Sequence, residues 1–366
     1  MRESVMPVAL PILDRPIRLA VVGLGQIAEL MLPPYLAHAE VEIVAACDAN
    51  GDRLDRWRPG LGDAHLTTDL DELVAMPGID VVDVLVPTPL HGDIGVRVLE
   101  AGHHLQIQKP IARTIQDCDR LLAAAAANGA EMRVLEDYVF FPPLVKLRDI
   151  VRSGELGDAV GLHMKVVNTG RGGWEVLPTA YEWQLEQTKD GRGMLVFDHA
   201  WHQIAVATWL FGPIRSIVGW IGETEVVPGF ALDAPATLAW EHHNGLRATL
   251  DITLAVDTLW KSDFYSCDER VEVTCARGSV RCNRISAAGK QEPSLEIYKD
   301  GEVRSFHTLD DGGDAGFIAS TQHMVDVFRG RSADVLMSGA DARQVLVALL
   351  AGLDSSADGV HLRHLG

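Results

Sequence analysis

Three closely spaced small residues, Gly23, Gly25 and Ala28, follow the apolar run that begins at Ile17. Glycine at the first position permits a sharp reversal, and glycine at the second lets backbone N–H groups approach a pyrophosphate. Alanine at the third lets a helix pack closely on a strand, and the helix N-terminus offers unpaired N–H donors and a partial positive charge. The turn therefore predicts a dinucleotide site. The residues that we expect to line it are Gly23, Gly25, Gln26, Ile27 and Ala28.

A carboxylate, Asp48, follows the second apolar run, Glu42–Cys47, about twenty residues past the glycines. At that distance a carboxylate can accept hydrogen bonds from both ribose hydroxyls of NAD. It would repel the 2′-phosphate of NADP, and the nearest cation, Arg53, lies about one helical turn away. The sequence therefore favours NAD over NADP. The alternative is a glycine turn in a doubly wound domain that binds no nucleotide.

Lys109 comes directly after a strand pattern, His104–Gln108, and is followed by Pro110. Oxidation of a secondary alcohol by hydride transfer requires the loss of a hydroxyl proton whose pKa lies far above neutrality. A cation at the oxygen stabilises the developing alkoxide and lowers that cost. Taken alone, Lys109 fits a solvated lysine at a strand end better than a catalytic one.

Asp198 and His202 are four residues apart at the start of an apolar helical pattern, so we expect both to project from one helix face. Histidine titrates near neutral pH and can take up a proton as the hydride leaves. The alternative is a capping aspartate and a packed histidine. We expect no metal site, because no third ligand can be placed and His199 points elsewhere on the helix.

The segments 171–174 and 181–183 bring tryptophans close in sequence to arginine and glutamate. Such a set suits a sugar ring, which offers an apolar face for stacking and hydroxyls for hydrogen bonds. We therefore expect Arg171, Trp174 and Trp183 to contribute to substrate binding, together with Lys109 and His202. The alternative is that the tryptophans are core or dimer contacts.

These motifs together resemble the Gfo/Idh/MocA family of NAD(P)-dependent oxidoreductases, which includes glucose-fructose oxidoreductase and inositol dehydrogenases. The resemblance covers nearly the whole chain and rests on Gly23-Leu24-Gly25-Gln26-Ile27-Ala28, Pro87-Thr88-Pro89-Leu90-His91, Lys109-Pro110 and Asp198-His199-Ala200-Trp201-His202. It implies that Lys109 is the catalytic lysine and His202 the general acid or base, while Asp198 binds a substrate hydroxyl or orients the imidazole. Further residues expected at the cofactor are Pro87, Thr88, Pro89, His91, Gln108, Lys109 and Glu136.

Two positions depart from the family pattern. Most members have glutamate where this chain has Gln108, and the neutral amide removes a carboxylate that would keep Lys109 charged. We therefore expect a shifted pH optimum of activity. The segment Glu136-Asp137-Tyr138-Val139-Phe140 resembles the family's Glu-Asn-aromatic-Arg-aromatic segment, with Val139 in place of the arginine. A relative's substrate therefore does not transfer directly to this chain.

Before about residue 152 the predicted elements alternate between strand and helix. The predicted strands begin at Ile17 and continue with Glu42–Cys47, Val81–Val86, His104–Gln108 and Met132–Leu135. The predicted helices, besides the one after the glycine turn, are Asp69–Ala75, Gly92–Ala101, Ile115–Asn128 and a helix from Phe141 to Arg152. Regular alternation predicts an α/β fold with a parallel, doubly wound Rossmann sheet.

Beyond Gly154 the pattern changes to successive hairpins. The predicted strands are Asp158–Asn168, Ile214–Ile221, Ala236–His243, Arg247–Leu254, Val271–Cys275, Ser294–Lys299 and Val303–His307, and the predicted helices are Asp198–Phe211, Gly316–Arg329 and Gly339–Asp358. Asn244-Gly245 and Asp300-Gly301 predict type I′ turns. We expect an extended arm over residues 1–16 and a dinucleotide-binding domain over 17–145. An α+β domain with a large, mostly antiparallel open sheet, for substrate binding and dimerisation, is expected over 146–366.

The chain has 366 residues, 47% of them hydrophobic, and a formal net charge of −19. The length suits two domains, and the acidic balance argues against nucleic acid or an anionic membrane as a partner. The five cysteines are scattered and odd in number, so we expect reduced thiols in a cytoplasmic protein. Residues 1–16 do not resemble a signal peptide, and no apolar run is long enough to span a membrane.

The sequence as a whole predicts an NAD-dependent oxidoreductase that acts on a secondary alcohol or ketone of a sugar, a sugar derivative or a cyclitol. We expect a homodimer or homotetramer formed through the C-terminal sheet, where the strands in 236–254 carry apolar residues at alternate positions. One alternative is a redox-neutral glycosidase or lyase that uses tightly bound NAD. Another is a non-catalytic sensor of the same fold. The substrate and the direction of the reaction are not determined by these motifs.

Overall fold

The computed structural model describes residues 13–173, 178–189, 191–228, 230–262, 266–286, 289 and 291–366. Most of the expected N-terminal arm, residues 1–12, lies outside the described residues. The chain divides into two compact units. The first unit joins the residues up to Asp137 with Phe317–Arg343, and the second joins Tyr138–Gly316 with Gln344–Gly366.

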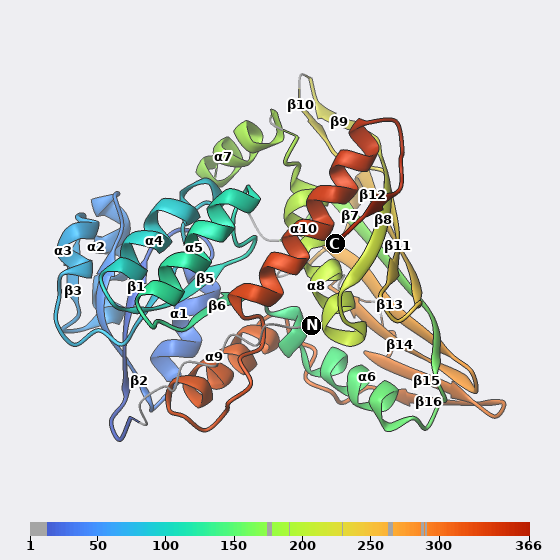
Figure 1. Ribbon diagram of the computed structural model, residues 1–366, viewed down its shortest axis with the longest axis horizontal. Helices are drawn as coiled ribbons and strands as arrows, with labels where there is room; N and C mark the ends of the chain where they lie inside the picture. The colour runs from blue at the N-terminus through green and yellow to red at the C-terminus, as the bar shows by residue number, and fades with distance from the viewer. Residues whose placement is uncertain are drawn as a thin grey trace. The chain divides into compact units, whose positions relative to one another are not determined.

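The first unit is built on a six-stranded sheet in which every neighbouring pair is parallel (Figure 1). Its strands, in spatial order, are β3 (His65–Thr67), β2 (Val41–Cys47), β1 (Ile17–Val22), β4 (Val81–Val84), β5 (His104–Gln108) and β6 (Met132–Leu135). The side chains of the central strand β4 and of the edge strand β6 are buried throughout, as expected for parallel strands with both faces covered. The predicted doubly wound Rossmann sheet is confirmed.

Some helices of this unit begin where short polar side chains can accept backbone N–H groups. Asn50, Asp69 and Thr114 cap α2, α3 and α5 in this way. The helices are α1 (Ala28–Ala37), α2 (Gly51–Leu61), α3 (Leu70–Val74), α4 (His91–Glu100), α5 (Ile115–Ala127) and α9 (Ala315–Phe328), with a 3₁₀ turn, η1, at Thr88–Leu90. Helix α2 was not predicted from the sequence, because its polar composition and internal Pro59 obscure the helical pattern.

Helix α9 completes the core of the first unit although it is distant from that unit in the sequence. Its apolar residues Phe317, Met324 and Phe328 pack in the same buried cluster as Leu19 on β1 and Leu32 on α1. The residues of α9 are more than one hundred and fifty positions beyond β6, and no local pattern indicates which sheet they cover.

A row of polar side chains crosses the buried face of this sheet. Asp83, Gln106 and Arg133 are paired neighbours on β4, β5 and β6, and all three are buried. Tyr35 donates a hydrogen bond to Asp83 Oδ2 (2.6 Å), and Arg133 donates to the Ser320 carbonyl on α9 (3.1 Å). Burial raises the pKa of Asp83 to about 6, against the opposing effect of the Tyr35 hydrogen bond. The row ties α9 to the sheet.

The second unit contains a nine-stranded sheet. Its spatial order is β16 (Glu302–Phe306), β15 (Leu295–Lys299), β14 (Gly278–Ile285), β13 (Cys267–Cys275), β7 (Ala159–Arg171), β12 (Arg247–Leu259), β11 (Ala236–His242), β8 (Ile214–Ile221) and β17 (Arg363–His364). Only the β12–β7 pair is parallel among these pairings, which confirms the predicted large, mostly antiparallel sheet. A separate hairpin joins β9 (Thr224–Val227) and β10 (Phe230–Leu232).

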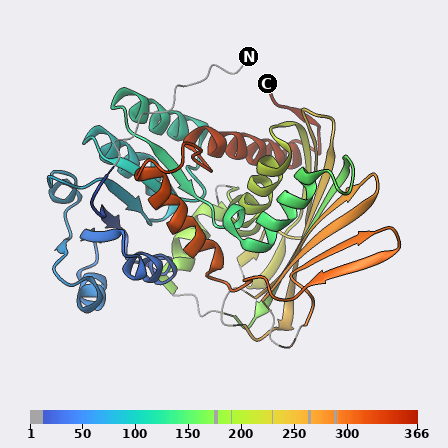
Figure 2. The same ribbon diagram turned by 90° about the horizontal axis from the view of Figure 1, so that it is seen from below.

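Helices lie against one face of this sheet. They are α6 (Pro142–Ser153), α8 (Ala200–Phe211) and the part of α10 (Gly339–Ala357) that belongs to the second unit, as Figures 1 and 2 show. The close approach is visible at Gly219, where a Cβ would lie 2.5 Å from the Gly352 carbonyl of α10. The unit also contains η2 (Tyr138–Phe140), α7 (Pro178–Lys189) and η3, a π-helical segment at Met194–His199. Among the described residues, no helix has both the length and the apolar character needed to cross a membrane.

Two local predictions for this unit are corrected. Asp300 and Gly301 both have positive φ, as a type I′ turn requires, but at the other hairpin only Gly245 does (φ +88°). There the loop spans three residues between His242 and Leu246, with glycine in the left-handed position. The helical stretch predicted from Asp198 instead starts at Met194 and is π-helical up to His199. The α-helical spacing rule therefore does not determine how Asp198 points relative to His202.

Candidate functional site

The carboxyl ends of the parallel strands bring most of the predicted cofactor residues to one edge of the first unit. Gly23 follows β1, Asp48 follows β2, and Thr88 lies just beyond β4. Lys109 follows β5 and Glu136 follows β6. In an open parallel sheet this edge is where ligands bind, because the connecting loops and the helix N-termini meet there.

The glycine turn has the geometry that a pyrophosphate requires. Gly23 has φ +96°, and a Cβ on it would lie 2.8 Å from the Leu85 carbonyl oxygen. Its N–H donates to the Cys47 carbonyl (2.8 Å), which ties the turn to β2. Gly25, Gln26 and Ile27 are partly exposed just before α1 begins at the buried Ala28. The backbone N–H groups of a helix N-terminus are thus presented at the surface, and the residues fit a dinucleotide.

Asp48 is nearly buried and holds the turn in shape. Its Oδ2 accepts the Leu24 N–H (2.7 Å), and its Oδ1 accepts the Asn50 N–H (2.8 Å). The Arg53 guanidinium lies 3.4 Å from Oδ2, and its Nη1 is 3.9 Å from the Cβ position of Gly25. The cation that the sequence placed a turn away is therefore beside the carboxylate. A positive charge therefore compensates Asp48, and the carboxylate by itself does not decide between NAD and NADP.

The proline-rich loop after β4 is held in place by His91. Thr88 is buried, Pro87 is half-buried and Pro89 is exposed. His91 is fully buried, with one ring nitrogen 2.9 Å from the Pro110 carbonyl and the other 2.9 Å from the Val86 carbonyl. A ring engaged on both sides by the backbone supports the loop, and we revise its expected role from cofactor contact to support of the loop.

Lys109 lies at the same edge, half-buried, in a cis Lys109-Pro110 peptide. The side-chain oxygen of Gln108 accepts the Lys109 N–H (2.7 Å) and so supports the backbone that carries the lysine. Glu136 is fully buried at the end of β6.

In the second unit, the candidate residues Asp198 and His202 lie on consecutive helical segments. Asp198 is half-buried on the π-helical segment, and His202 is 7% exposed on α8. The start of the π-helical segment is held by Asp233, whose carboxylate oxygens accept the N–H groups of Leu195 (2.8 Å) and Val196 (2.7 Å). A side chain distant in sequence thus caps the segment that carries Asp198.

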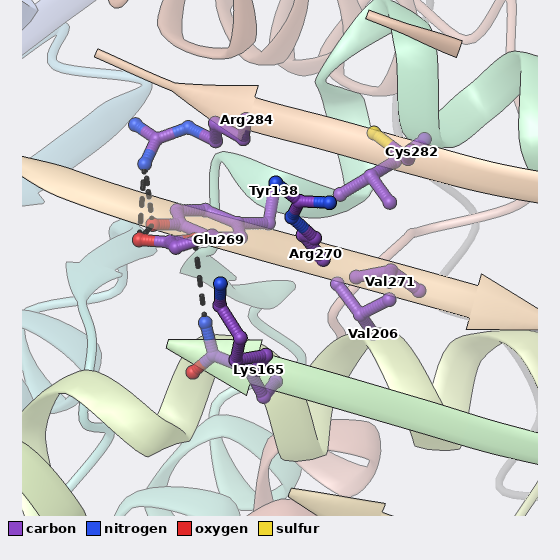
Figure 3. Close-up of a pocket in the computed structure, with 10 residues that line it drawn as sticks. Tyr138, Lys165, Val206, Glu269, Arg270, Val271, Cys282 and Arg284 are labelled. Atoms are coloured by element: carbon purple, nitrogen blue, oxygen red, sulfur yellow. Dashed lines mark hydrogen bonds and ion pairs between the residues drawn. The ribbon is translucent and has the colours of Figure 1, made fainter. Parts of the chain in front are cut away.

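A cluster of polar side chains surrounds the ring of Tyr138, on η2, beside His202. The imidazole of His202 is stacked on the phenol ring, with 4.0 Å between centroids and 11° between planes. The Tyr138 hydroxyl donates to Glu269 Oε1 on β13 (2.9 Å) and accepts a hydrogen bond from Arg284 on β14 (2.7 Å). Figure 3 shows Tyr138, Glu269 and Arg284 converging in this way. His199 also reaches Glu269 Oε1, at 3.0 Å.

Glu269 is the charged centre of this cluster. Burial alone would raise the pKa of its carboxyl, but the Arg284 guanidinium and the bond to His199 outweigh burial and hold the pKa well below its ordinary value. Glu269 was not among the residues predicted from the sequence, and no role was predicted for His199. A signal was available: Glu269 alternates with Val271, Val273 and Cys275, which places a carboxylate on the buried face of a strand.

The remaining predicted substrate residues are less constrained. Arg171 is exposed at the end of β7, and Trp183 is partly buried on α7. Trp174 lies outside the described residues. All five cysteines are buried free thiols.

Comparison with known proteins finds related sequences for both units. Residues 17–135 match a family model described as an oxidoreductase family with an NAD-binding Rossmann fold. Residues 144–281 match the model of the GFO/IDH/MocA C-terminal domain.

Individual proteins are similar to the chain at low identity. The 1-carboxy-3-chloro-3,4-dihydroxycyclohexa-1,5-diene dehydrogenase of Comamonas testosteroni is 29% identical over 56% of this chain, and the match spans only 50% of that protein. Inositol 2-dehydrogenase of Salmonella paratyphi B is 23% identical over 80% of this chain and 83% of that protein. An oxidoreductase from Agrobacterium radiobacter, solved with NAD⁺, L-tartaric acid and magnesium, has a TM-score of 0.80 at 18% identity and covers 95% of this chain and 98% of its own.

Proposed function

The chain belongs to the Gfo/Idh/MocA family of oxidoreductases, and from that premise we propose that it transfers a hydride between NAD and a secondary alcohol or ketone of a sugar, a sugar derivative or a cyclitol. The observation that carries the proposal is the glycine turn, in which a side chain on Gly23 would meet the Leu85 carbonyl and the residues just before α1 are partly exposed. The substrate class is supported by the inositol dehydrogenase, which resembles the chain over most of its length.

The cofactor binds along the carboxyl edge of the first unit. The amides of Gly25 and Ile27 would hold the pyrophosphate, and the remaining lone pairs of Asp48 would accept hydrogen bonds from the ribose hydroxyls. When bound, the nicotinamide takes up or supplies the hydride. The Asp48 carboxylate makes NADP bind more weakly than NAD, and the Arg53 guanidinium, 3.4 Å from Asp48, keeps NADP from being excluded.

Three side chains carry the chemistry in this proposal. Lys109 stabilises the negative charge that develops on the substrate oxygen. His202 accepts the hydroxyl proton in the oxidation direction and returns it in the reduction direction. Asp198 binds a neighbouring hydroxyl and so orients the substrate. The half-buried setting of Lys109 and the nearly complete burial of His202 support these roles, because partial exclusion of water strengthens electrostatic interactions.

The test is to incubate the purified full chain with NAD and a panel of sugars and inositols and to follow the absorbance of reduced nicotinamide. We expect one or more compounds to be oxidised, and we expect Lys109→Met and His202→Asn to abolish turnover. Lys146→Met, which alters an exposed lysine on α6, is the matched control and should leave turnover unchanged. Conversion of a glycoside without net reduction of NAD would instead favour the redox-neutral alternative, and bound NAD without any conversion would favour a sensor.

We also propose that two copies associate through the face of the nine-stranded sheet that does not contact α6 and α8. Trp220 on β8 is 60% exposed and Leu362, before β17, is 53% exposed. A shallow groove on this face is lined by His163, Val218, Thr249 and Leu362. Light scattering on the purified chain should give the mass of a dimer or tetramer, and Trp220→Glu should reduce it to that of a monomer.

A further inference from the structure

We propose that Tyr138, anchored by Glu269 and Arg284, is a positioning residue that fixes the ring plane of His202. The proposal rests on the proposed role of His202 as the proton acceptor and extends it to the residues that orient the imidazole. A catalytic imidazole must present one chosen nitrogen to the substrate, and a helix backbone alone does not achieve this. The terminal torsion of a histidine side chain has broad, shallow minima, so packing against the ring has to select one orientation.

The stack on Tyr138 supplies that selection. With 11° between the planes and 4.0 Å between the centroids, rotation of the imidazole about its terminal torsion would drive it into the phenol ring. On the helix side, the His199 ring meets His202 edge-on at 5.8 Å and 81°. The imidazole is therefore bounded by one ring across its face and another at its side.

The Tyr138 ring can fix the orientation of the imidazole only because its own position is fixed by hydrogen bonds. Its hydroxyl lies between Glu269 Oε1, at 2.9 Å, and Arg284 Nη1, at 2.7 Å. The guanidinium carbon of Arg284 lies over the same ring, 4.5 Å from its centroid. Glu269 and Arg284 are paired neighbours on β13 and β14, so the hydroxyl is fastened to the sheet at two points.

Glu269 also fastens the helical segments on either side of His202. Its Oε1 lies 3.0 Å from His199 Nε2, and its Oε2 accepts a hydrogen bond from Gln203 Nε2 at 3.4 Å. The Glu269 carboxylate thus contacts His199, which precedes His202 on the helix, and Gln203, which follows it directly. It also accepts the hydroxyl hydrogen bond of Tyr138, whose ring stacks on His202. A buried carboxylate with this set of partners links the sheet to the orientation of a single imidazole.

The test observes His202 directly, so it does not require the substrate. The full chain is labelled with ¹³C and ¹⁵N histidine, and the His202 and His199 resonances are assigned from His202→Asn and His199→Asn. In Tyr138→Leu we expect the His202 ring protons to move downfield, because they lose the ring-current shielding of the phenol. The shift should exceed that of every other histidine except His199. Tyr298→Leu, which removes an exposed tyrosine of the same unit, should leave His202 unchanged.

Two milder variants guard against loss of folding. Tyr138→Phe keeps the ring and removes the hydroxyl, and Glu269→Gln keeps the volume and removes the charge. We expect both to broaden or shift the His202 signal while most other histidine signals stay in place. With a substrate from the panel, Tyr138→Phe should lower kcat by about 10- to 100-fold at nearly constant KM.

The outcomes separate this inference from the proposed function. An unchanged His202 signal in folded Tyr138→Leu, or in both milder variants, overturns the positioning role. Full activity of His202→Asn would overturn the proposed chemistry, whereas the spectroscopic result would still report on the stack. A kcat that is unchanged in Tyr138→Phe, in an enzyme that is inactive as His202→Asn, would also overturn the positioning role.

Discussion

The anchoring of the π-helical segment by Asp233 yields a prediction that can be worked through from the structure. The carboxylate accepts the N–H groups of Leu195 and Val196 at 2.8 and 2.7 Å. A hydrogen bond to a charged group contributes about 1.5 kcal/mol at the lower end of its range, so Asp233→Ala should remove about 3 kcal/mol from the local stability of the segment. Since 1.36 kcal/mol corresponds to a factor of ten, local opening should become about a hundredfold more frequent.

Gly193 allows the same contact to be tested from the other side. A Cβ on Gly193 would lie 2.0 Å from Asp233 Cγ, so Gly193→Ala must displace the carboxylate even when Asp233 is present. We expect Gly193→Ala to cost about as much as Asp233→Ala. The double variant should cost little more than either single one, because the two substitutions remove the same interaction.

Hydrogen–deuterium exchange followed by mass spectrometry measures this effect without a substrate. Peptides that cover Met194–His199 and the first turn of α8 should lose protection by about a hundredfold, while peptides from β1 and α1 serve as internal references. Asp257→Ala, which removes an exposed carboxylate of the same unit, is the matched control. Unchanged protection in Asp233→Ala, or strictly additive losses in the double variant, would refute the reasoning.

Three further predictions concern the first unit. Gly23→Ala should weaken NADH binding at least tenfold, because φ is +96° and the new Cβ would lie 2.8 Å from the Leu85 carbonyl. Fluorescence titration measures this affinity. As a control, Gly62→Ala, at a position with positive φ but open space, should leave NADH binding unchanged. Arg53→Ala should weaken NADPH binding about tenfold and NADH binding much less, because Arg53 lies beside Asp48; equal losses would contradict a role of Arg53 at the 2′-phosphate. The pKa of Asp83 is about 6 in the folded chain against 3.8 ordinarily, so its stabilising contribution is present at low pH and is lost as the pH rises through 6. Chemical denaturation should therefore show wild type losing about 1 kcal/mol relative to Asp83→Asn between about pH 5 and pH 7.5, and a pH-independent difference would argue against a raised pKa of Asp83.

Much of the first unit follows from local patterns. The strands β1, β2, β4, β5 and β6 are apolar runs with clear ends, and parallel pairing then places every residue that follows them at one edge. The candidate cofactor residues from Gly23 to Glu136 could be gathered from the sequence for that reason. A residue close to a strand end can be assigned to that edge from the local sequence, without information on how distant segments pack.

Other features of the fold and of the candidate site depend on contacts between residues far apart in the chain. Helix α9 completes the core of the first unit, Arg53 lies beside Asp48, and His91 is enclosed by two backbone carbonyls. The cluster of Glu269 around Tyr138 needs β13, η2 and α8 to meet, over a separation of 131 residues between the two side chains. Periodicity reports which face of an element is buried, but not which side chain it meets there. That pairing is determined when distant segments pack together and their polar atoms must find partners away from water.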